Sequence, residues 1–119
     1  MAIQSYKDLQ VWQKAIELVT MIYRLTESFP QKEIYGLTSQ MRRSSVSIPS
    51  NVAEGSRRGS RAEFRHFLLI AFGSGAELET QLEISKKLSF GNEKDIESCL
   101  HLLEEVMKML NVFISKMTK

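Results

Sequence analysis

Apolar residues recur every three or four positions along most of this 119-residue chain, which is the spacing of one face of an α-helix. Short stretches that contain proline, glycine or asparagine divide the pattern into four segments. The pattern therefore predicts four amphipathic helices, which cover residues 8–28, 31–58, 60–89 and 92–117.

The first and the last predicted helices have unusually wide apolar faces. In the first helix one seam is Leu9, Trp12, Ile16, Val19 and Tyr23, and the adjacent seam is Val11, Ala15, Leu18, Ile22 and Leu25. Two seams are more than the core of a four-helix bundle strictly needs, and exposed apolar patches commonly mark contacts with another molecule. We therefore predict a homo-oligomer, and the alternative is a monomer with a large core.

Two prolines constrain the predicted helices. The residue before a proline is pushed out of the α region, so the first helix should end near Phe29. Pro49 lies inside the second helix, where it removes one backbone hydrogen bond and crowds the preceding turn. We expect the second helix to be kinked near Ser47, or to be broken into two helices.

The connections carry recognisable capping residues. Ser60 followed by Glu63 fits a capping box at the start of the third helix. Gly91 suits a helix C-terminal position and Asn92 an N-cap, so they should separate the third helix from the fourth. Two glycines inside the third helix, in the range 73–75, predict that another helix packs closely there.

Four helices joined by short turns predict an all-α fold, an antiparallel up-down-up-down four-helix bundle formed as one domain by residues 1–119. The content of 43% hydrophobic and 25% charged residues is that of a globular domain. The sequence shows no apolar run of transmembrane length and no signal-peptide core, so we expect a cytoplasmic protein without a membrane partner.

The charge is distributed unevenly. Six of the seven arginines fall within residues 40–67 against two glutamates, which gives that quarter about +4 in a chain of net charge +2. The planar arginine fork suits phosphate or carboxylate groups. Bundle geometry is expected to gather Arg57, Arg58, Arg61 and Arg65 at one end, where they would form a salt-sensitive nucleic-acid-binding surface.

The other two arginines of this cluster lie within the second predicted helix, among residues expected to be buried. For Arg42 and Arg43 we favour a structural role or a subunit contact, with Glu54 and Glu79 among the carboxylates available to pair with arginines. An alternative function follows from this reading. The protein would be a protein-binding scaffold whose arginines hold subunits together.

Catalytic residues are hard to find in this sequence. Arg61 and His66 have the Arg-x4-His spacing of helical ribonucleases of the higher-eukaryote and prokaryote nucleotide-binding class, but Ala62 stands where those enzymes usually have a polar residue. A ribonuclease is therefore a remote alternative. Cys99 is expected to fill the core, and no Glu-x-x-His pair accompanies His66 or His101, so we predict no metal, no cofactor and no enzyme activity.

Three segments carry a family resemblance: YGLTSQMRR at 35–43, SIPSNVAEG at 47–55 and GSGAELETQL at 73–82. They resemble the four-helix bundle proteins encoded in intervening sequences of bacterial 23S ribosomal RNA genes. The resemblance extends from about residue 8 into the last helix, which matches only in pattern. It implies a ring-like homopentamer and a loose association with ribosomes or RNA.

Accessory proteins of diversity-generating retroelements look similar in fold, and they bind nucleic acid and a reverse transcriptase. The residue pattern and the resemblance lead to the same hypothesis. It is a non-enzymatic, homo-oligomeric bundle that binds RNA or a ribonucleoprotein through an arginine-rich patch.

Overall fold

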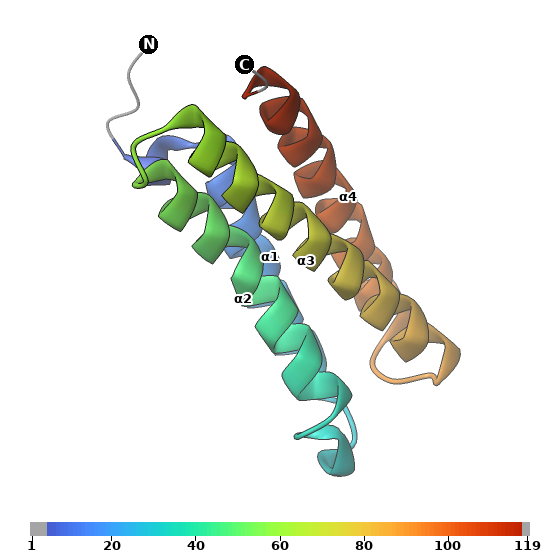
Figure 1. Cartoon of the computed structure of the whole chain (residues 1–119). Coiled ribbons are helices and arrows are strands. Elements are labelled where there is room, and N and C mark those ends of the chain that lie inside the picture. The colour runs from blue at the N-terminus through green and yellow to red at the C-terminus, as the bar shows by residue number, and fades with distance from the viewer. Residues whose placement is uncertain (1–4, 118–119) are drawn as a thin grey trace.

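Four long helices make up most of the chain in the computed structural model, which describes residues 5–117 (Figure 1). They are α1 (Gln10–Thr26), α2 (Leu37–Ser56), α3 (Arg61–Lys87) and α4 (Glu93–Lys116). Two short 3-10 helices, η1 (Tyr6–Asp8) and η2 (Gln31–Glu33), precede α1 and α2. Residues 5–117 contain no strand, so the predicted all-α, four-helix class is confirmed.

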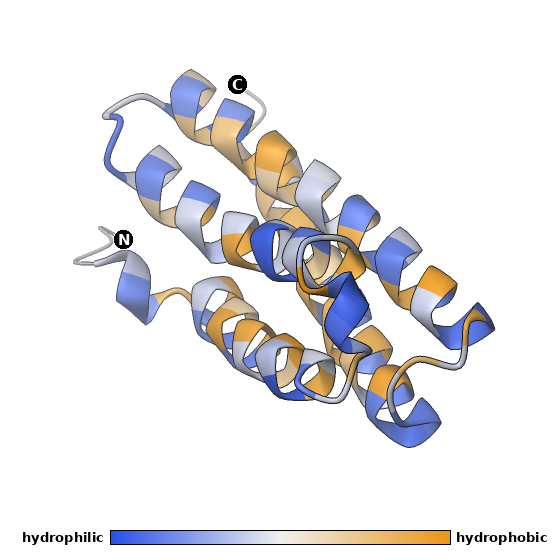
Figure 2. Cartoon of the chain, turned by 90° about the horizontal axis from the view of Figure 1, so that it is seen from below, coloured by the Kyte–Doolittle hydropathy of each residue, from blue (hydrophilic) through white to orange (hydrophobic). Residues whose placement is uncertain are grey.

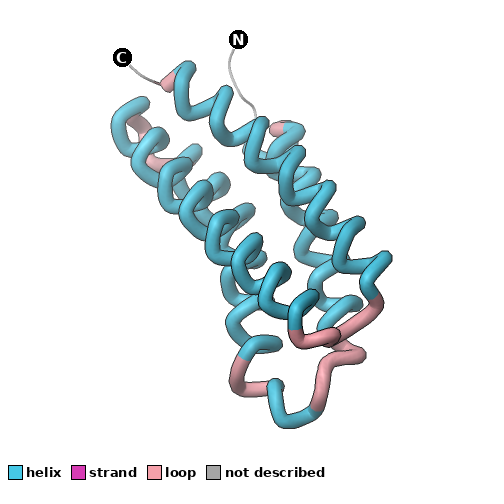
Figure 3. The backbone as a smooth tube through the Cα atoms, turned by 90° about the vertical axis from the view of Figure 1, so that its right-hand side faces the viewer, coloured by secondary structure: helices cyan, strands magenta, loops and turns pink. Residues whose placement is uncertain are grey.

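The helices form an elongated bundle of 45 × 24 × 21 Å. Helices α1 and α3 each pack against both α2 and α4, and the contact between α2 and α3 is the most extensive. The α2–α3 turn lies at the same end as η1 and the end of α4, whereas the α1–α2 and α3–α4 connections lie at the other end (Figures 1 and 3). Such connections are those of an up-down-up-down bundle.

Helix α2 differs from its predicted bounds. It begins at Leu37 rather than near residue 31, because η2 and Gly36 precede it, and Gly36 has φ −111° and ψ −115°, outside the helical region. Helix α2 then continues through the buried Pro49 to Ser56, so the alternative of two separate helices is wrong. The kink near Pro49 stays a prediction.

The predicted N-caps of α3 and α4 are confirmed. Ser60 Oγ accepts a hydrogen bond from the Glu63 amide at 3.1 Å, and Asn92 Oδ1 accepts from two amides at the start of α4. The residue that ends α3 differs from the prediction. Ser89, with φ 60°, takes the left-handed position, and the Phe90 amide donates to Ser85 O at 2.9 Å.

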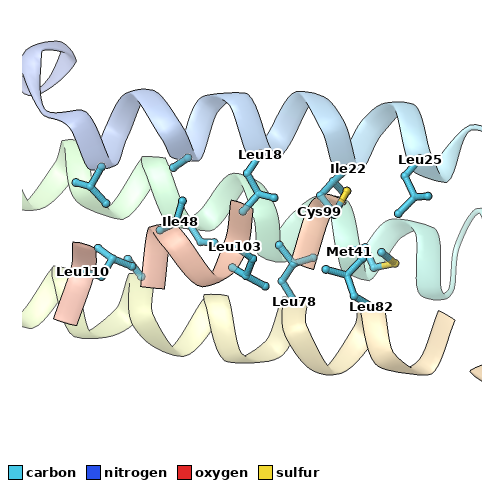
Figure 4. Packing of buried hydrophobic residues seen from close by; sticks show 14 of the residues in the cluster. Leu18, Ile22, Leu25, Met41, Ile48, Leu78, Leu82, Cys99, Leu103 and Leu110 are labelled. Carbon is cyan, nitrogen blue, oxygen red and sulfur yellow. The ribbon is translucent and has the colours of Figure 1, made fainter. Parts of the chain in front are cut away.

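The core lies between the four helices and consists mainly of leucine, isoleucine and valine (Figure 4). Each helix carries hydrophobic residues beside hydrophilic ones, as the hydropathy colours show (Figure 2). On α1 the seam that contains Leu18 and Ile22 is fully buried. The other predicted seam is only partly covered, since Ile16 is 39% exposed and Tyr23 41% exposed. One chain therefore leaves apolar surface of α1 open to solvent.

Small side chains allow α2 and α3 to approach closely. Ser44 Oγ donates to Gln81 Oε1, and the hydroxyls of Ser47 and Ser74 share a hydrogen bond, both at 2.7 Å. Nearer the turn, a Cβ added at Gly55 would lie 2.7 Å from the Phe67 Cβ. These contacts satisfy the buried hydroxyls and leave no room for larger residues.

The two glycines of α3 have different surroundings. A Cβ at Gly75 would collide with Met107 of α4, which confirms the predicted close packing there. Gly73 is exposed, and within residues 5–117 no atom outside the adjacent backbone of α3 lies within 4 Å of the place of its Cβ. Only Gly75 is therefore explained by packing within the chain.

We predict opposite stability changes for two glycine-to-alanine substitutions. Gly55→Ala should lower the free energy of unfolding by roughly 1–3 kcal/mol, because the new methyl meets the root of the Phe67 side chain and the Phe64 carbonyl. Gly73→Ala, the matched control, should raise it by up to about 1 kcal/mol through helix propensity. Urea unfolding followed by circular dichroism measures both, and an equal change in the two variants would contradict this account.

Candidate nucleic-acid interface

The α2–α3 turn is short and fully exposed. Helix α2 ends at Ser56 and α3 begins at Arg61, so four residues connect them, all exposed. Gly59 has φ 94°, the left-handed region that favours glycine. Ser60 then caps α3. The turn carries Arg57 and Arg58 on the surface of the bundle.

Both turn arginines lie over aromatic rings. The Cζ atom of Arg57 is 5.4 Å from the centroid of Tyr6 in η1, and the Cζ atom of Arg58 is 4.8 Å from the centroid of Phe67 in α3. Arg58 also donates to Glu54 at 2.7 Å. Their side chains are 46% and 53% exposed, so this i,i+4 pair contributes only about 0.3–0.5 kcal/mol and yields readily to another anion.

Arg61 and Arg65 lie at the same end but are less available. Arg61 Nη2 donates to the carbonyl oxygen of Lys116 at 2.6 Å, where it satisfies a carbonyl at the end of α4. Arg65 is partly buried, and its Nε has no hydrogen-bond partner within residues 5–117. The structure thus brings the four predicted site residues to one end. Within residues 5–117 the guanidinium of Arg57 has no hydrogen bond or ion pair, whereas Arg58 shares its charge with Glu54.

Arg42 contacts α1. Its Nε donates to Thr26 Oγ1 at 2.9 Å, its Nη2 lies 3.4 Å from Tyr23 O, and its Cζ is 4.6 Å from the Tyr23 ring centroid. Its partners are therefore a hydroxyl, a carbonyl and a ring rather than a carboxylate. Arg43 is exposed and lines a polar groove of about 430 Å³ between α2 and α3, together with Tyr35 and Glu77.

The two glutamates named with these arginines lie far apart in the bundle. Glu54 pairs with Arg58 near the α2–α3 turn. Glu79 is exposed and lines a groove of about 360 Å³ between α3 and α4, beside Glu83 and Glu104. These three glutamates thus lie away from the arginine turn, whereas Glu63 lies beside it in the first turn of α3.

Arg61 and His66 do not form a joint site within the chain. Five residues of helix separate them by about 140° around the axis. Arg61 reaches the end of α4, whereas His66 is exposed and its ring lies edge-on to Phe67 at 5.6 Å. The described residues also contain no group of three or more histidine, cysteine, aspartate or glutamate side chains that could hold a metal ion.

One ion pair links α3 to α4 at the end opposite the arginines. Lys86 Nζ lies 2.6 Å from Glu97 Oε2. The hydrogen bond from Lys86 lowers the pKa of Glu97, and the same bond raises the pKa of Lys86. Both groups are exposed, so the pair contributes little to stability.

Sequence reasoning missed the aromatic partners of the turn arginines. Tyr6 lies before the first predicted helix, and Phe67 falls at one of the apolar positions of the third. Phe67 is partly buried beside Gly55 of α2, and Arg58 lies over its ring. Spacing along the chain gives no signal for the Tyr6–Arg57 contact, since 51 residues separate the two.

The protein is thus a small, all-α four-helix bundle with arginines gathered at one end. The family model described as 23S rRNA-intervening sequence protein matches residues 7–112, so the chain belongs to that family. The resemblance noted in the sequence is thereby confirmed.

A solved structure agrees with this assignment. It is a protein of unknown function from the S23 ribosomal protein family of Bacteroides thetaiotaomicron, with 27% identity and a TM-score of 0.78 over 87% of this chain and 97% of that one. No curated protein matches the sequence. Within the described residues, none of the helices has the length and apolar character needed to span a bilayer.

We predict that Cys99 is unreactive in the folded protein. The side chain is buried in the core, and burial is the main cause that raises the pKa of its thiol from 9.0 to about 11. At pH 8 the thiolate fraction should be about a hundredfold lower than in the unfolded chain. Iodoacetamide labelling of native and urea-unfolded protein measures the difference, and similar rates in both states would refute a buried thiol.

Proposed function

We propose that this protein is a non-enzymatic, homo-oligomeric four-helix bundle that binds RNA or a ribonucleoprotein through its arginine end, which we define as Arg57, Arg58, Arg61 and Arg65. The observation that carries the proposal is the gathering of these residues from the α2–α3 turn and the start of α3 (Figure 1). Two of them are exposed on a turn where an extended anion can approach.

The surroundings of the arginine end favour a polyanion. Lys7 of η1 and Lys116, whose carbonyl accepts from Arg61, are exposed cations at this end. Cations outnumber anions there, since within residues 5–117 the exposed carboxylates at this end are Asp8, Glu54 and Glu63. Glu54 is held only by a weak surface ion pair. Each phosphate that replaces a carboxylate or solvent near these cations releases counterions, which makes binding favourable at low salt and largely independent of sequence.

The family supports an RNA context. Its members are described by their link to 23S rRNA intervening sequences, and the solved relative is placed in a ribosomal protein family although its function is unknown. These descriptions apply to the family and to the relative. For this chain they make ribosomal RNA fragments the first nucleic acids to test.

We predict that Arg57→Gln/Arg58→Gln weakens binding to labelled ribosomal RNA fragments. Removing two cations should make the slope of log affinity against log salt shallower by about 1.4 on a single strand. Fluorescence anisotropy across a salt series measures it. The matched control is Lys32→Gln/Lys87→Gln, which removes two exposed cations at the opposite end and should leave affinity nearly unchanged.

Three results would overturn the assignment. Absence of salt-sensitive binding by the nucleic-acid-free parent protein would remove the proposed function. Equal loss of RNA affinity in both double variants would show that binding depends on the net charge of the protein and not on the arginine end. Dissociation of an assembly on substitution of Arg57 and Arg58 would support the alternative scaffold, in which these arginines hold subunits together.

The open apolar surface supports the homo-oligomeric part of the proposal. Ile16 and Tyr23 leave one seam of α1 half-exposed. On α3, Leu69 is 42% exposed and Ile84 43% exposed. Apolar surface of this extent is stabilised when a second copy covers it. We expect the homopentamer that the family resemblance implies.

We predict that Ile16→Glu dissociates this assembly without unfolding the chain, because it places a charge on the exposed seam. The parent should have a mass of about 68 kDa, five times the 13.7 kDa chain, and the variant should approach one chain. Asn111→Glu adds the same charge at an exposed polar position of α4 and serves as the control. Sedimentation equilibrium measures the masses, and a monomeric parent would refute the oligomer.

A further inference from the structure

The two turn arginines differ from simple surface cations because aromatic rings restrain their side chains. Arg57 lies over Tyr6 and Arg58 over Phe67, so each guanidinium rests on a ring from an element beside the turn. The two rings come from η1 and α3, on different sides of the turn. Two consecutive arginines of the turn therefore each have a guanidinium group over an aromatic ring.

The rings are themselves fixed in the fold. Tyr6 packs edge-on to Trp12 with centroids 5.5 Å apart, and Phe67 is partly buried with its Cβ next to Gly55 of α2. Cation–π attraction restrains the guanidinium groups, so less conformational entropy is lost when a ligand binds them. Both arginines remain exposed, with their outer surfaces open to solvent.

The hydrogen-bonding groups of the two arginines are also partly free. The guanidinium of Arg57 makes no hydrogen bond or ion pair within residues 5–117, whereas Arg58 donates one to Glu54. A guanidinium that is covered by a ring on one side still offers its other face for stacking and its N–H edge to an anion. The free face could stack on a nucleotide base, and the N–H edge could donate to its phosphate.

We infer that the α2–α3 turn recognises unpaired nucleotides of RNA, with bases stacked on the guanidinium groups of Arg57 and Arg58. This inference rests on the proposed RNA binding and names the kind of RNA. In a duplex the bases are already stacked on one another, so a duplex offers the turn only phosphates and sugars. Unpaired bases add stacking, which is independent of sequence and less sensitive to salt than charge neutralisation.

The modest charge of the chain favours this reading. A net charge of +2 is small for a protein that holds nucleic acid by phosphate contacts alone. Stacking on two arginines supplies binding free energy that does not scale with net charge. The surface therefore suits single-stranded segments, loops or bulges better than continuous helices.

The test separates stacking from charge. Dissociation constants are measured for a single-stranded RNA of about 12 nucleotides and for its duplex, with the parent protein and with Arg57→Lys/Arg58→Lys. Lysine keeps the charge and lacks the planar group, so single-strand affinity should fall about tenfold while duplex affinity changes little. Arg24→Lys, the same exchange at an exposed arginine of α1, is the control and should change neither.

A second variant and a direct readout support the comparison. Tyr6→Leu removes the ring beneath Arg57, keeps every charge and should weaken single-strand binding in the same direction. Because this change touches Trp12 packing, its unfolding curve is recorded alongside. A 2-aminopurine base in the single strand should lose fluorescence on binding to the parent, through stacking, and lose less with the lysine variant.

The possible results separate base stacking on the two arginines from RNA binding itself. Equal affinity of the parent for single strand and duplex, or equal weakening of both by the lysine variant, overturns stacking but leaves RNA binding in place. Absence of any salt-sensitive RNA binding removes the proposed function itself.

Discussion

The close packing of α2 against α3 is the constraint on which the rest of the structure depends. Small residues such as Ser47, Ser74 and Gly55 let the two backbones approach, and hydrogen bonds between side chains satisfy the buried hydroxyls. Because the helices stay close up to their ends, four residues suffice to connect them. The short turn holds its arginines against Phe67 and η1 rather than leaving them on a long loop, so helix packing determines the geometry of the cationic end.

The arginines of the cluster differ in what they do within the chain. Arg42 and Arg61 each donate to a carbonyl in the last turn of a neighbouring helix, α1 for Arg42 and α4 for Arg61. Cations at these positions complement the helix dipole. Hydrogen bonds to carbonyls orient these two cations and occupy some of their donors, but they leave the positive charge in place. On the α2–α3 turn, Arg57 is exposed without an ion pair inside residues 5–117, and Arg58 is exposed in a surface pair with Glu54.

Much of the fold could be predicted from residue patterns, because helical period and capping are local properties. Ser60 and Asn92 cap their helices as expected, and the two seams of α1 are present, one buried and one half-exposed. Long-range geometry could not be predicted. The contact of Arg57 with Tyr6 depends on how η1 folds against α2, and the contact of Arg61 with Lys116 depends on where α4 ends. The left-handed conformation of Ser89 was not evident from its residue type, and it lets the Phe90 amide reach Ser85 O at the end of α3.

The bundle carries its charges unequally along its 45 Å axis. Arginines gather at the α2–α3 turn, while Glu93, Asp95 and Glu97 lie near the start of α4 at the far end (Figure 1). This distribution gives the chain a dipole component along its length, which is reduced near the acidic end by Lys86, Lys87 and Lys94. Under the proposed RNA binding, the field of the polyanion would exert a torque that turns the α2–α3 turn toward it before contact, most strongly at low ionic strength.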